Sequence, residues 1–206
     1  MIVDHPLVRD SLTQLRDSST PPESFRQLLK RLALLLAYEA TKDLGERESI
    51  VQTPLCETVG SALNQRLALV PILRAGLGMV DAVLELIPQA EVWHLGIYRD
   101  ERTAQPVEYY SRLPSTAPAD VALVLDPMLA TGGSVLAALA TLRHWGVPSV
   151  KVLSIIASAD GLQAVESEFP DVPLYVAAVD QELNAHKYIV PGLGDAGDRA
   201  FNTLPR

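Results

Sequence analysis

Apolar residues from about residue 67 onward form short continuous runs, and segments with helical periodicity separate these runs. Runs of this kind predict buried strands at Leu67–Leu73, Val92–Tyr98, Val121–Leu125, Val150–Ala157 and Leu174–Val179. Helices are predicted between them, from Arg74-Ala75-Gly76 to Ile87, over Ser134–Trp145 and over Gly161–Phe169. Strands that alternate with helices predict an α/β fold, a mostly parallel central sheet flanked by helices.

The N-terminal part, to about residue 45, has a helical pattern of its own. Thr20 is expected to cap a helix, Pro21 suits the first helical position, and Glu23 completes a capping box. The helix is expected to run to about Leu44 and to end at Gly45. Its apolar face, suited to the core or to a subunit interface, consists of Leu28, Leu32, Leu35 and Leu36.

Two segments interrupt the alternation of strands and helices. Arg99–Asp120 is long, polar and contains proline, so we expect either a β-arm or flap, or a plain surface excursion. Asn184–Asp198 is rich in glycine and is predicted to be neither helix nor regular strand. Irregular loops of this length in a compact domain are often functional.

Composition narrows the class of protein. The 206 residues fit one α/β domain, and the hydrophobic content of 48% is ample for a core. A net charge of −8 argues against nucleic-acid binding. Cys56 is the only cysteine, which excludes an internal disulfide, and it is expected to be partly buried. The sequence shows no signal peptide and no membrane-spanning run, so we expect a cytosolic protein that binds no membrane.

The stretch Val121–Ser134 carries the main chemical signal, V-A-L-V-L-D-P-M-L-A-T-G-G-S. An apolar strand delivers Asp126, and a loop of small residues then leads to a helix at Ser134. Gly132 and Gly133 let the backbone approach an anion, and the N–H groups of Ala130 to Ser134 suit a phosphate. A carboxylate beside an anion cradle suggests a sugar phosphate, although an ordinary strand-turn-helix has the same local pattern.

Other candidate residues are expected at the same edge of the sheet. Ligands of open α/β sheets bind beyond the carboxyl ends of the strands. Arg74, Arg99, Asp126 and the segment after Val179 each follow a predicted strand. The loop is neither a Walker motif, which has a lysine after the glycines, nor the dinucleotide fingerprint G-x-G-x-x-G.

Taken together, these motifs resemble the uracil phosphoribosyltransferase family. The matching stretches are V-D-H-P-L (residues 3–7), A-Y-E-A-T (37–41), P-I-L-R-A-G-L-G-M (71–79), G-I-Y-R-D-E (96–101), P-V-E-Y-Y (106–110), D-P-M-L-A-T-G-G-S (126–134) and Y-I-V-P-G-L-G-D-A-G-D (188–198). The loop marks phosphoribosyltransferases in general, whereas the glycine-rich C-terminal stretch is what points to uracil.

The resemblance implies a type I phosphoribosyltransferase fold over a single domain, residues 1–206. It also implies that the chain joins uracil to 5-phosphoribosyl 1-diphosphate (PRPP), which gives UMP and diphosphate. Magnesium is implied as a cofactor that is bound mainly through the PRPP phosphates. Some family members are activated by GTP and form homodimers or homotetramers.

The resemblance also assigns roles to individual residues. Arg74 and Arg99 match the arginines for the diphosphate, a role that suits the planar guanidinium fork. PRPP contacts are implied for Asp126, Pro127, Met128, Leu129, Ala130, Thr131, Gly132, Gly133, Ser134 and Asp195. Uracil contacts are implied for Ile189, Gly194, Asp195 and Ala196. Asp195 also fits a plain capping or turn role.

Two residues depart from the family pattern, and two other functions stay open. Arg102 stands where relatives usually carry an acid, and Lys187 stands where a glycine is usual. One alternative is a phosphoribosyltransferase-like regulator that binds pyrimidine nucleotides and RNA, although 17 basic against 25 acidic residues predict no basic face. The other is transfer to another base such as a purine, against which the C-terminal stretch argues.

Overall fold

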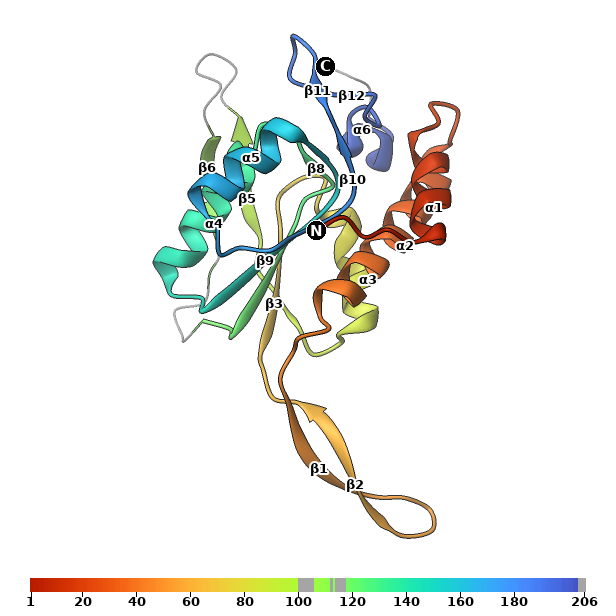
Figure 1. Cartoon of the computed structure of the whole chain (residues 1–206), viewed down its shortest axis with the longest axis vertical. Coiled ribbons are helices and arrows are strands. Elements are labelled where there is room, and N and C mark those ends of the chain that lie inside the picture. Colours follow the sequence, from red (N-terminus) through yellow and green to blue (C-terminus); the bar gives the residue numbers. More distant parts are fainter. Residues whose placement is uncertain (100–105, 112, 114–117, 204–206) are drawn as a thin grey trace.

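A parallel β-sheet forms the centre of the computed structural model, which describes residues 1–99, 106–111, 113 and 118–203 (Figure 1). Its strands lie in the order β10-β9-β7-β3-β4, with β8 paired to β9, and their pairings are parallel. The strands are β3 (Leu67–Pro71), β4 (Glu91–Val92), β7 (Val121–Leu125), β8 (Met128–Leu129), β9 (Ser149–Ser158) and β10 (Leu174–Asp180). The predicted α/β class is confirmed.

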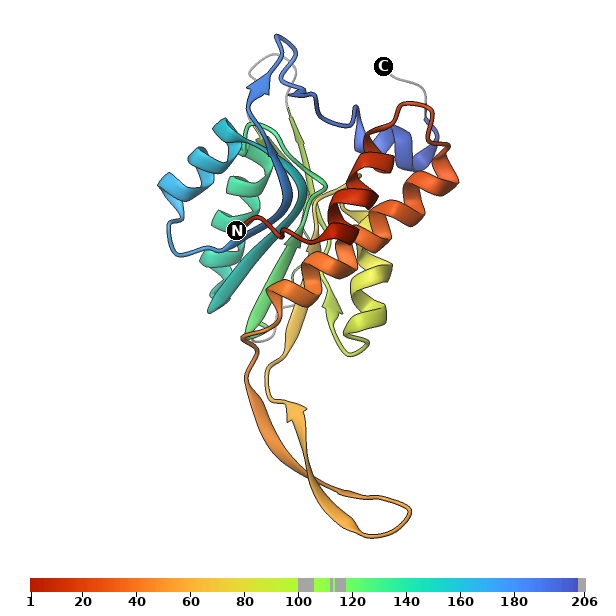
Figure 2. The ribbon, with the colours of Figure 1, turned by 45° about the vertical axis from the view of Figure 1, so that its right-hand side comes forward.

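Helices cover both faces of this sheet (Figure 2). One face carries α1 (Pro6–Arg16), α2 (Pro22–Ala40) and α3 (Leu77–Leu86), and the other carries α4 (Gly133–Trp145) and α5 (Ala159–Glu168). Successive residues of a strand point to opposite faces, so Leu123 packs in the core under α1–α3 and Val124 in the core under α4 and α5. No helix among the described residues has the length and apolar content to cross a bilayer.

The antiparallel hairpin of β1 (Glu46–Gln52) and β2 (Glu57–Leu63) extends away from the body (Figure 1). Neither this hairpin nor helix α1 is predicted by the sequence patterns. Cys56 lies at the hairpin turn and is exposed, so the expectation of a partly buried thiol is wrong. A narrow ribbon has no interior in which the thiol could be buried.

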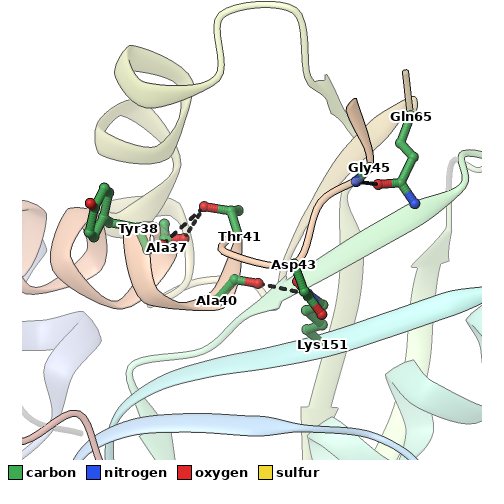
Figure 3. Close-up of polar contacts among 8 residues, drawn as sticks. All are labelled: Ala37, Tyr38, Ala40, Thr41, Asp43, Gly45, Gln65 and Lys151. Carbon is green, nitrogen blue, oxygen red and sulfur yellow. Dashed lines mark hydrogen bonds and ion pairs between the residues drawn. The ribbon is translucent and has the colours of Figure 1, made fainter. Parts of the chain in front are cut away.

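A buried lysine fastens the root of this hairpin to the sheet (Figure 3). The Lys151 side chain is 5% exposed, donates to the Ala40 carbonyl at 2.7 Å and pairs with Asp43. The hydrogen bond from Lys151 holds the pKa of the Asp43 carboxyl below its usual value. On the return strand, the Gln65 side chain accepts from the Gly45 N–H at 2.7 Å. Both roots of the ribbon are therefore held by specific polar contacts.

Helix α2 differs from its prediction at both ends. The residue before it is Pro21, which has no side-chain cap, and the Thr20 hydroxyl donates instead to the Gln14 carbonyl at 2.6 Å. The predicted capping box is therefore wrong, because α1 lies close enough for its Gln14 carbonyl to accept from the Thr20 hydroxyl. The helix ends at Ala40, before the predicted Leu44, since the chain turns here toward the hairpin. Its apolar stripe lies in the core as predicted, with Leu28, Leu32 and Leu36 buried and Leu35 half-buried.

The two interrupting segments are partly regular. The strand predicted over Val92–Tyr98 is two strands, β4 and β5 (Leu95–Arg99), because the chain leaves the central sheet between them. A hairpin is confirmed where β5 pairs with β6 (Pro106–Ser111), and Arg102 lies outside the described residues. The C-terminal segment Asn184–Asp198, predicted to be irregular, holds β12 (Ile189–Val190), which pairs with β11 (Glu182–Leu183), and the start of α6 (Ala196–Phe201).

Candidate active site

The loop after β7 forms an open pocket of about 150 Å³ at the carboxyl end of the sheet. Its left-handed residue is Gly132, at φ +82°, just before α4 begins. The first N–H groups of a helix have no carbonyl partner within it, so they are available to an anion in this pocket. The pocket is lined by Asp126, Met128, Leu129, Ala130, Thr131, Gly132, Gly133, Ser134 and Val135. We call residues 126–134 the phosphate loop.

Pro127 is the one predicted loop residue that does not line this pocket. It is buried, and its carbonyl accepts from the N–H groups of Ile155 and Ile156 at 3.1 Å. Pro127 therefore ties the phosphate loop to β9, and Asp126 is the single acid among the described residues that faces the pocket.

The Asp126 carboxyl has a raised pKa. Burial raises its pKa from 3.8 to about 7, against the opposing effect of the Met128 N–H, which donates to the carboxyl at 3.3 Å. Without a ligand, the carboxyl thus holds its proton to a higher pH than an ordinary aspartic acid does. A ligand that donates hydroxyl groups to it favours the anion, and this suits the diol of a ribose.

Ser158 and Gly161 hold the phosphate loop from the side of α5. The Ser158 hydroxyl donates to the Ala130 carbonyl and accepts from the Gly161 N–H at 2.9 Å. A Cβ atom at Gly161 would lie 2.4 Å from the Ala130 oxygen and 2.7 Å from the Leu129 oxygen. Only glycine lets α5 approach the loop this closely. Sequence reasoning missed both residues, since neither belongs to the loop motif.

Gly161→Ala is therefore expected to displace the loop and to lower kcat/KM for PRPP at least ~10-fold, because small misplacements of a binding group are costly. Steady-state kinetics with PRPP varied measure the effect. Gly60→Ala is the control, since a Cβ there makes only ordinary contacts. Equal kinetics in the two variants would contradict a close fit of α5 against the loop.

A second glycine, Gly76, packs closely against the end of β7 and so places Arg74 near the phosphate loop. The chain turns after β3, and Gly76 packs so tightly that its Cβ would lie 2.3 Å from the Leu125 oxygen. Leu125 immediately precedes Asp126, so this contact brings the two candidate residues into one region. The exposed Arg74 guanidinium pairs with Asp198 of α6 at 2.8 Å. Arg74 thereby joins the strand ends to the C-terminal segment.

Arg99 is the last residue of β5, and its side chain lies outside the described part of the structure. Its predicted contact with diphosphate stays a prediction.

The C-terminal segment folds back sharply on itself. Ile189 is buried, and Gly192 turns above it at φ +59°, with room for no Cβ because the Ile189 oxygen would lie 2.0 Å away. Gly194 is also left-handed, at φ +78°. The Asp195 carboxylate accepts from the Asp198 N–H at 2.9 Å and so caps α6. The structure thus shows the capping role of Asp195, while its contacts with ligands stay a prediction.

Comparison with known proteins identifies the family. The family model described as uracil phosphoribosyltransferase matches residues 2–203. The chain belongs to the uracil phosphoribosyltransferase family. It is similar to the uracil phosphoribosyltransferase of Roseiflexus sp. (strain RS-1), at 56% identity over 98% of each chain. It is also similar to that of Dictyoglomus turgidum, at 50% identity over 98% of this chain and 99% of the relative.

Solved structures agree with the fold. The AQ2163 protein from Aquifex aeolicus matches with a TM-score of 0.93 and 40% identity, over 98% of this chain and 97% of that one. A hypoxanthine phosphoribosyltransferase from Staphylococcus aureus matches at a TM-score of 0.53 and 14% identity, over 77% and 76% of the two chains. The latter likeness concerns the fold alone.

The backbone at position 187 is one that suits glycine, the residue expected there from the resemblance. Lys187 has φ +64°, in the left-handed region that side chains disfavour. The turn is held by the Asn184 side chain, which accepts from the N–H groups of His186 and Tyr188 at 2.9 and 3.0 Å. The lysine is exposed and keeps the turn at some conformational cost.

We expect Lys187→Gly to stabilise the protein by about 0.5–1 kcal/mol, since relief of the left-handed strain exceeds the entropy that glycine adds to the unfolded chain. Urea unfolding at neutral pH measures this difference. Lys187→Ala serves as the control, because it removes the charge but keeps the strain. A gain of equal size in both variants would mean that the charge, not the backbone, is responsible.

Proposed function

We propose that this chain transfers the 5-phosphoribosyl group of PRPP to uracil, with the phosphate loop and Arg74 as the PRPP site. The observation that carries the proposal is the pocket in which one acidic carboxyl, Asp126, stands beside a glycine turn and a helix N-terminus. This donor set matches a phosphate with a neighbouring diol. Membership of the uracil phosphoribosyltransferase family supplies the acceptor base.

The reaction is a substitution at the anomeric carbon of PRPP. The bond from C1 to the diphosphate oxygen breaks with its electron pair on the oxygen, N1 of uracil bonds to C1, and the N1 proton passes to solvent. Positive charge develops on the ribose ring in the transition state, and negative charge on the leaving diphosphate. Catalysis by such a site consists mainly of positioning and charge stabilisation.

Each part of the substrate has a proposed partner. Thr131 and Ser134 supply hydroxyl groups beside the loop N–H groups for the 5-phosphate, and Asp126 accepts hydrogen bonds from the ribose hydroxyls. The carboxylate also stabilises positive charge on the nearby ring. Arg74, together with Arg99, binds the diphosphate and stabilises its growing charge.

Uracil is proposed to lie against the C-terminal segment, at Ile189 and Gly194-Asp195-Ala196. Backbone groups there match the alternating carbonyl and N–H edge of uracil. Cytosine has a different edge, and it would leave some of these groups unpaired. Ile189 is 3% exposed and packs in the core, so its backbone is the part proposed to face the base.

Magnesium fits this site only as a partner of the substrate. Of the residues that the structure describes, Asp126 is the single carboxylate that lines the phosphate pocket, and they contain no group of three possible ligands for a metal ion. A magnesium ion held by PRPP phosphates and water needs no more than one protein carboxylate. Bound in that way, it neutralises charge on the departing diphosphate.

The test is formation of UMP from uracil and PRPP with magnesium, with and without GTP. Uracil is expected to be consumed faster than cytosine, hypoxanthine or guanine, and a rate increase with GTP would identify an activator. Faster consumption of a purine would overturn the proposal. Binding of RNA without turnover of any base, weakened steeply by salt, would indicate a regulator instead.

A homodimer formed through the β1–β2 hairpin is proposed as well. The ribbon carries exposed apolar side chains, of which Ile50 and Val59 are direct cross-strand partners, 68% and 62% exposed. Leu55 at the turn is 94% exposed. An isolated two-stranded hairpin is at best marginally stable in water, so a second copy of the chain is a suitable partner for it.

Val59→Glu is accordingly expected to raise the dissociation constant of the dimer at least ~100-fold, because it places a charge in an apolar contact. Light scattering over a range of concentrations measures the change. Thr58→Glu adds the same charge on the other face of β2 and is the control. A wild-type chain that is monomeric at every concentration would contradict the proposed dimer.

A further inference from the structure

Three side chains from other elements hold the backbone of Gly192 and Leu193, just before the proposed uracil contacts. The Asp180 carboxylate at the end of β10 accepts from the Gly192 N–H at 3.0 Å. Arg16, the last residue of α1, donates to the Gly192 carbonyl at 2.8 Å. Arg199 of α6 donates to the Leu193 carbonyl at 2.8 Å.

Arg16 and Asp180 form a two-pronged ion pair. Both guanidinium Nη atoms lie 2.8 Å from a carboxylate oxygen, and the two side chains are 23% and 8% exposed. A pair so little exposed is weakly screened by solvent and has a defined geometry. The pair and the N–H and carbonyl of Gly192 therefore form one closed set of hydrogen bonds.

Arg199 connects the same loop to the end of α1. Its guanidinium donates to the Leu15 carbonyl at 2.7 Å and to the Asp17 carbonyl, and it lies 4.4 Å from the centre of the Phe25 ring. The C-terminal end of α1 thus lies within hydrogen-bond reach of α6 (Figure 2). The last carbonyls of a helix lack partners within it, so Arg199 satisfies them and fixes the loop with one group.

Such external support restrains the two most flexible positions of the segment. Gly192 and Gly194 both have left-handed backbones and no side chains that restrict them. Rotation of a peptide unit exchanges a donor for an acceptor on the surface that faces the base. A backbone that reads uracil rejects cytosine only as long as such rotations are prevented.

We propose that Arg16, Asp180 and Arg199 are positioning residues that set the preference for uracil by fixing the backbone of the C-terminal segment. This inference rests on the proposed function. None of the three is placed on the substrate, and each acts through Gly192 or Leu193. Helix α1 thereby contributes to the preference for uracil, although no contact with the base is proposed for it.

The experiment compares steady-state kinetics of the wild type, Arg16→Gln and the double variant Arg16→Leu/Asp180→Leu, with uracil and PRPP varied separately. Cytosine is tested as a substrate and as a competitive inhibitor. Both variants are expected to raise the KM for uracil at least ~10-fold and to leave the KM for PRPP within ~2-fold. The preference for uracil over cytosine is expected to fall at least ~10-fold.

The double variant separates positioning from folding. It removes both charges together, so no unpaired ion stays buried and the chain folds even where Arg16→Gln fails to. Arg143→Gln is the control, because Arg143 also pairs with an aspartate, Asp171, just before β10, but through one Nη atom and at an exposed site. Arg143→Gln is expected to keep wild-type values of both KM constants.

An unchanged KM for uracil in an active Arg16→Gln or double-leucine enzyme overturns the inference while the proposed function stands. Equal changes in both KM constants overturn it too, since they indicate general loosening. A wild-type enzyme that does not convert uracil overturns the proposed function instead.

Discussion

Asp126→Asn is expected to lower kcat/KM about 10²–10³-fold and at the same time to make the ligand-free protein more stable at pH 8. Activity falls because the amide carries no charge to stabilise the ribose ring and is a weaker acceptor for its hydroxyls. Stability rises because the wild type must keep an ionised carboxyl in a site where burial raises its pKa to about 7. Opposite changes of activity and stability are typical of active-site residues.

The pH dependence follows from the direction of this shift. Below the ordinary pKa of 3.8 the carboxyl is protonated in both the folded and the unfolded state, so it has no effect on stability. Between 3.8 and about 7 only the unfolded state loses the proton, and wild-type stability falls as the pH rises. Above pH 7 the penalty is complete, with an upper limit of about 4 kcal/mol at about 1.4 kcal/mol per pKa unit.

Urea unfolding of the ligand-free proteins at pH 4 and pH 8 measures the effect. The gain of Asp126→Asn over the wild type should be small at pH 4 and much larger at pH 8. Asp171→Asn is the control of opposite sign, since the hydrogen bond from Arg143 lowers the pKa of the Asp171 carboxyl. A variant that is less stable than the wild type at pH 8 would contradict a carboxyl destabilised by burial.

Arg74→Ala is the second substitution with a large expected effect, a loss of about 10²–10³-fold in kcat/KM for PRPP. The guanidinium fork that is proposed to bind the diphosphate disappears, and Arg74→Lys restores only part of the loss because an ammonium lacks the fork. The unfolding free energy should change by less than about 1 kcal/mol, since Arg74 is 55% exposed in its pair with Asp198.

Steady-state kinetics at varied PRPP concentration test this result. The control is Arg66, at the other end of β3. Arg66 precedes β3 just as Arg74 follows it, and it pairs with Glu91 at 2.6 Å while 53% exposed. Arg66→Ala should leave kcat/KM unchanged. Equal losses in the two variants would show that the effect comes from charge alone and not from the position of Arg74 at the carboxyl end.

Local pattern was sufficient for the sheet and for the phosphate loop. Buried parallel strands are continuous apolar runs, and β7 occupies the residues that its run predicts. The loop follows directly on that strand, so Asp126 and Gly132 are placed by chain connectivity. Arg74 follows β3 in the same way. The chemistry carried by these residues was visible because each lies just after a predicted strand end.

Features that depend on distant contacts were not predictable. The hairpin β1–β2 is exposed on both faces, so no alternation of apolar and polar residues marks it. Arg16 and Asp180 are 164 residues apart, and no local pattern pairs them. The raised pKa of Asp126 likewise depends on burial by surrounding elements. Thr20 reads as a helix cap in isolation, and only the position of Gln14 in space shows otherwise.

The contacts of Arg16 and Arg199 with Gly192 and Leu193 also bear on folding during synthesis. During synthesis the phosphate loop leaves the ribosome well before Gly192 and Arg199 do. Helix α1 leaves first. Until Arg199 is synthesised, the carbonyls of Leu15 and Asp17 lack the guanidinium that donates to them in the folded protein. The residues of the phosphate loop are thus synthesised before those proposed to contact the base, and helix α1 acquires its last hydrogen-bond partner only when the chain is nearly complete.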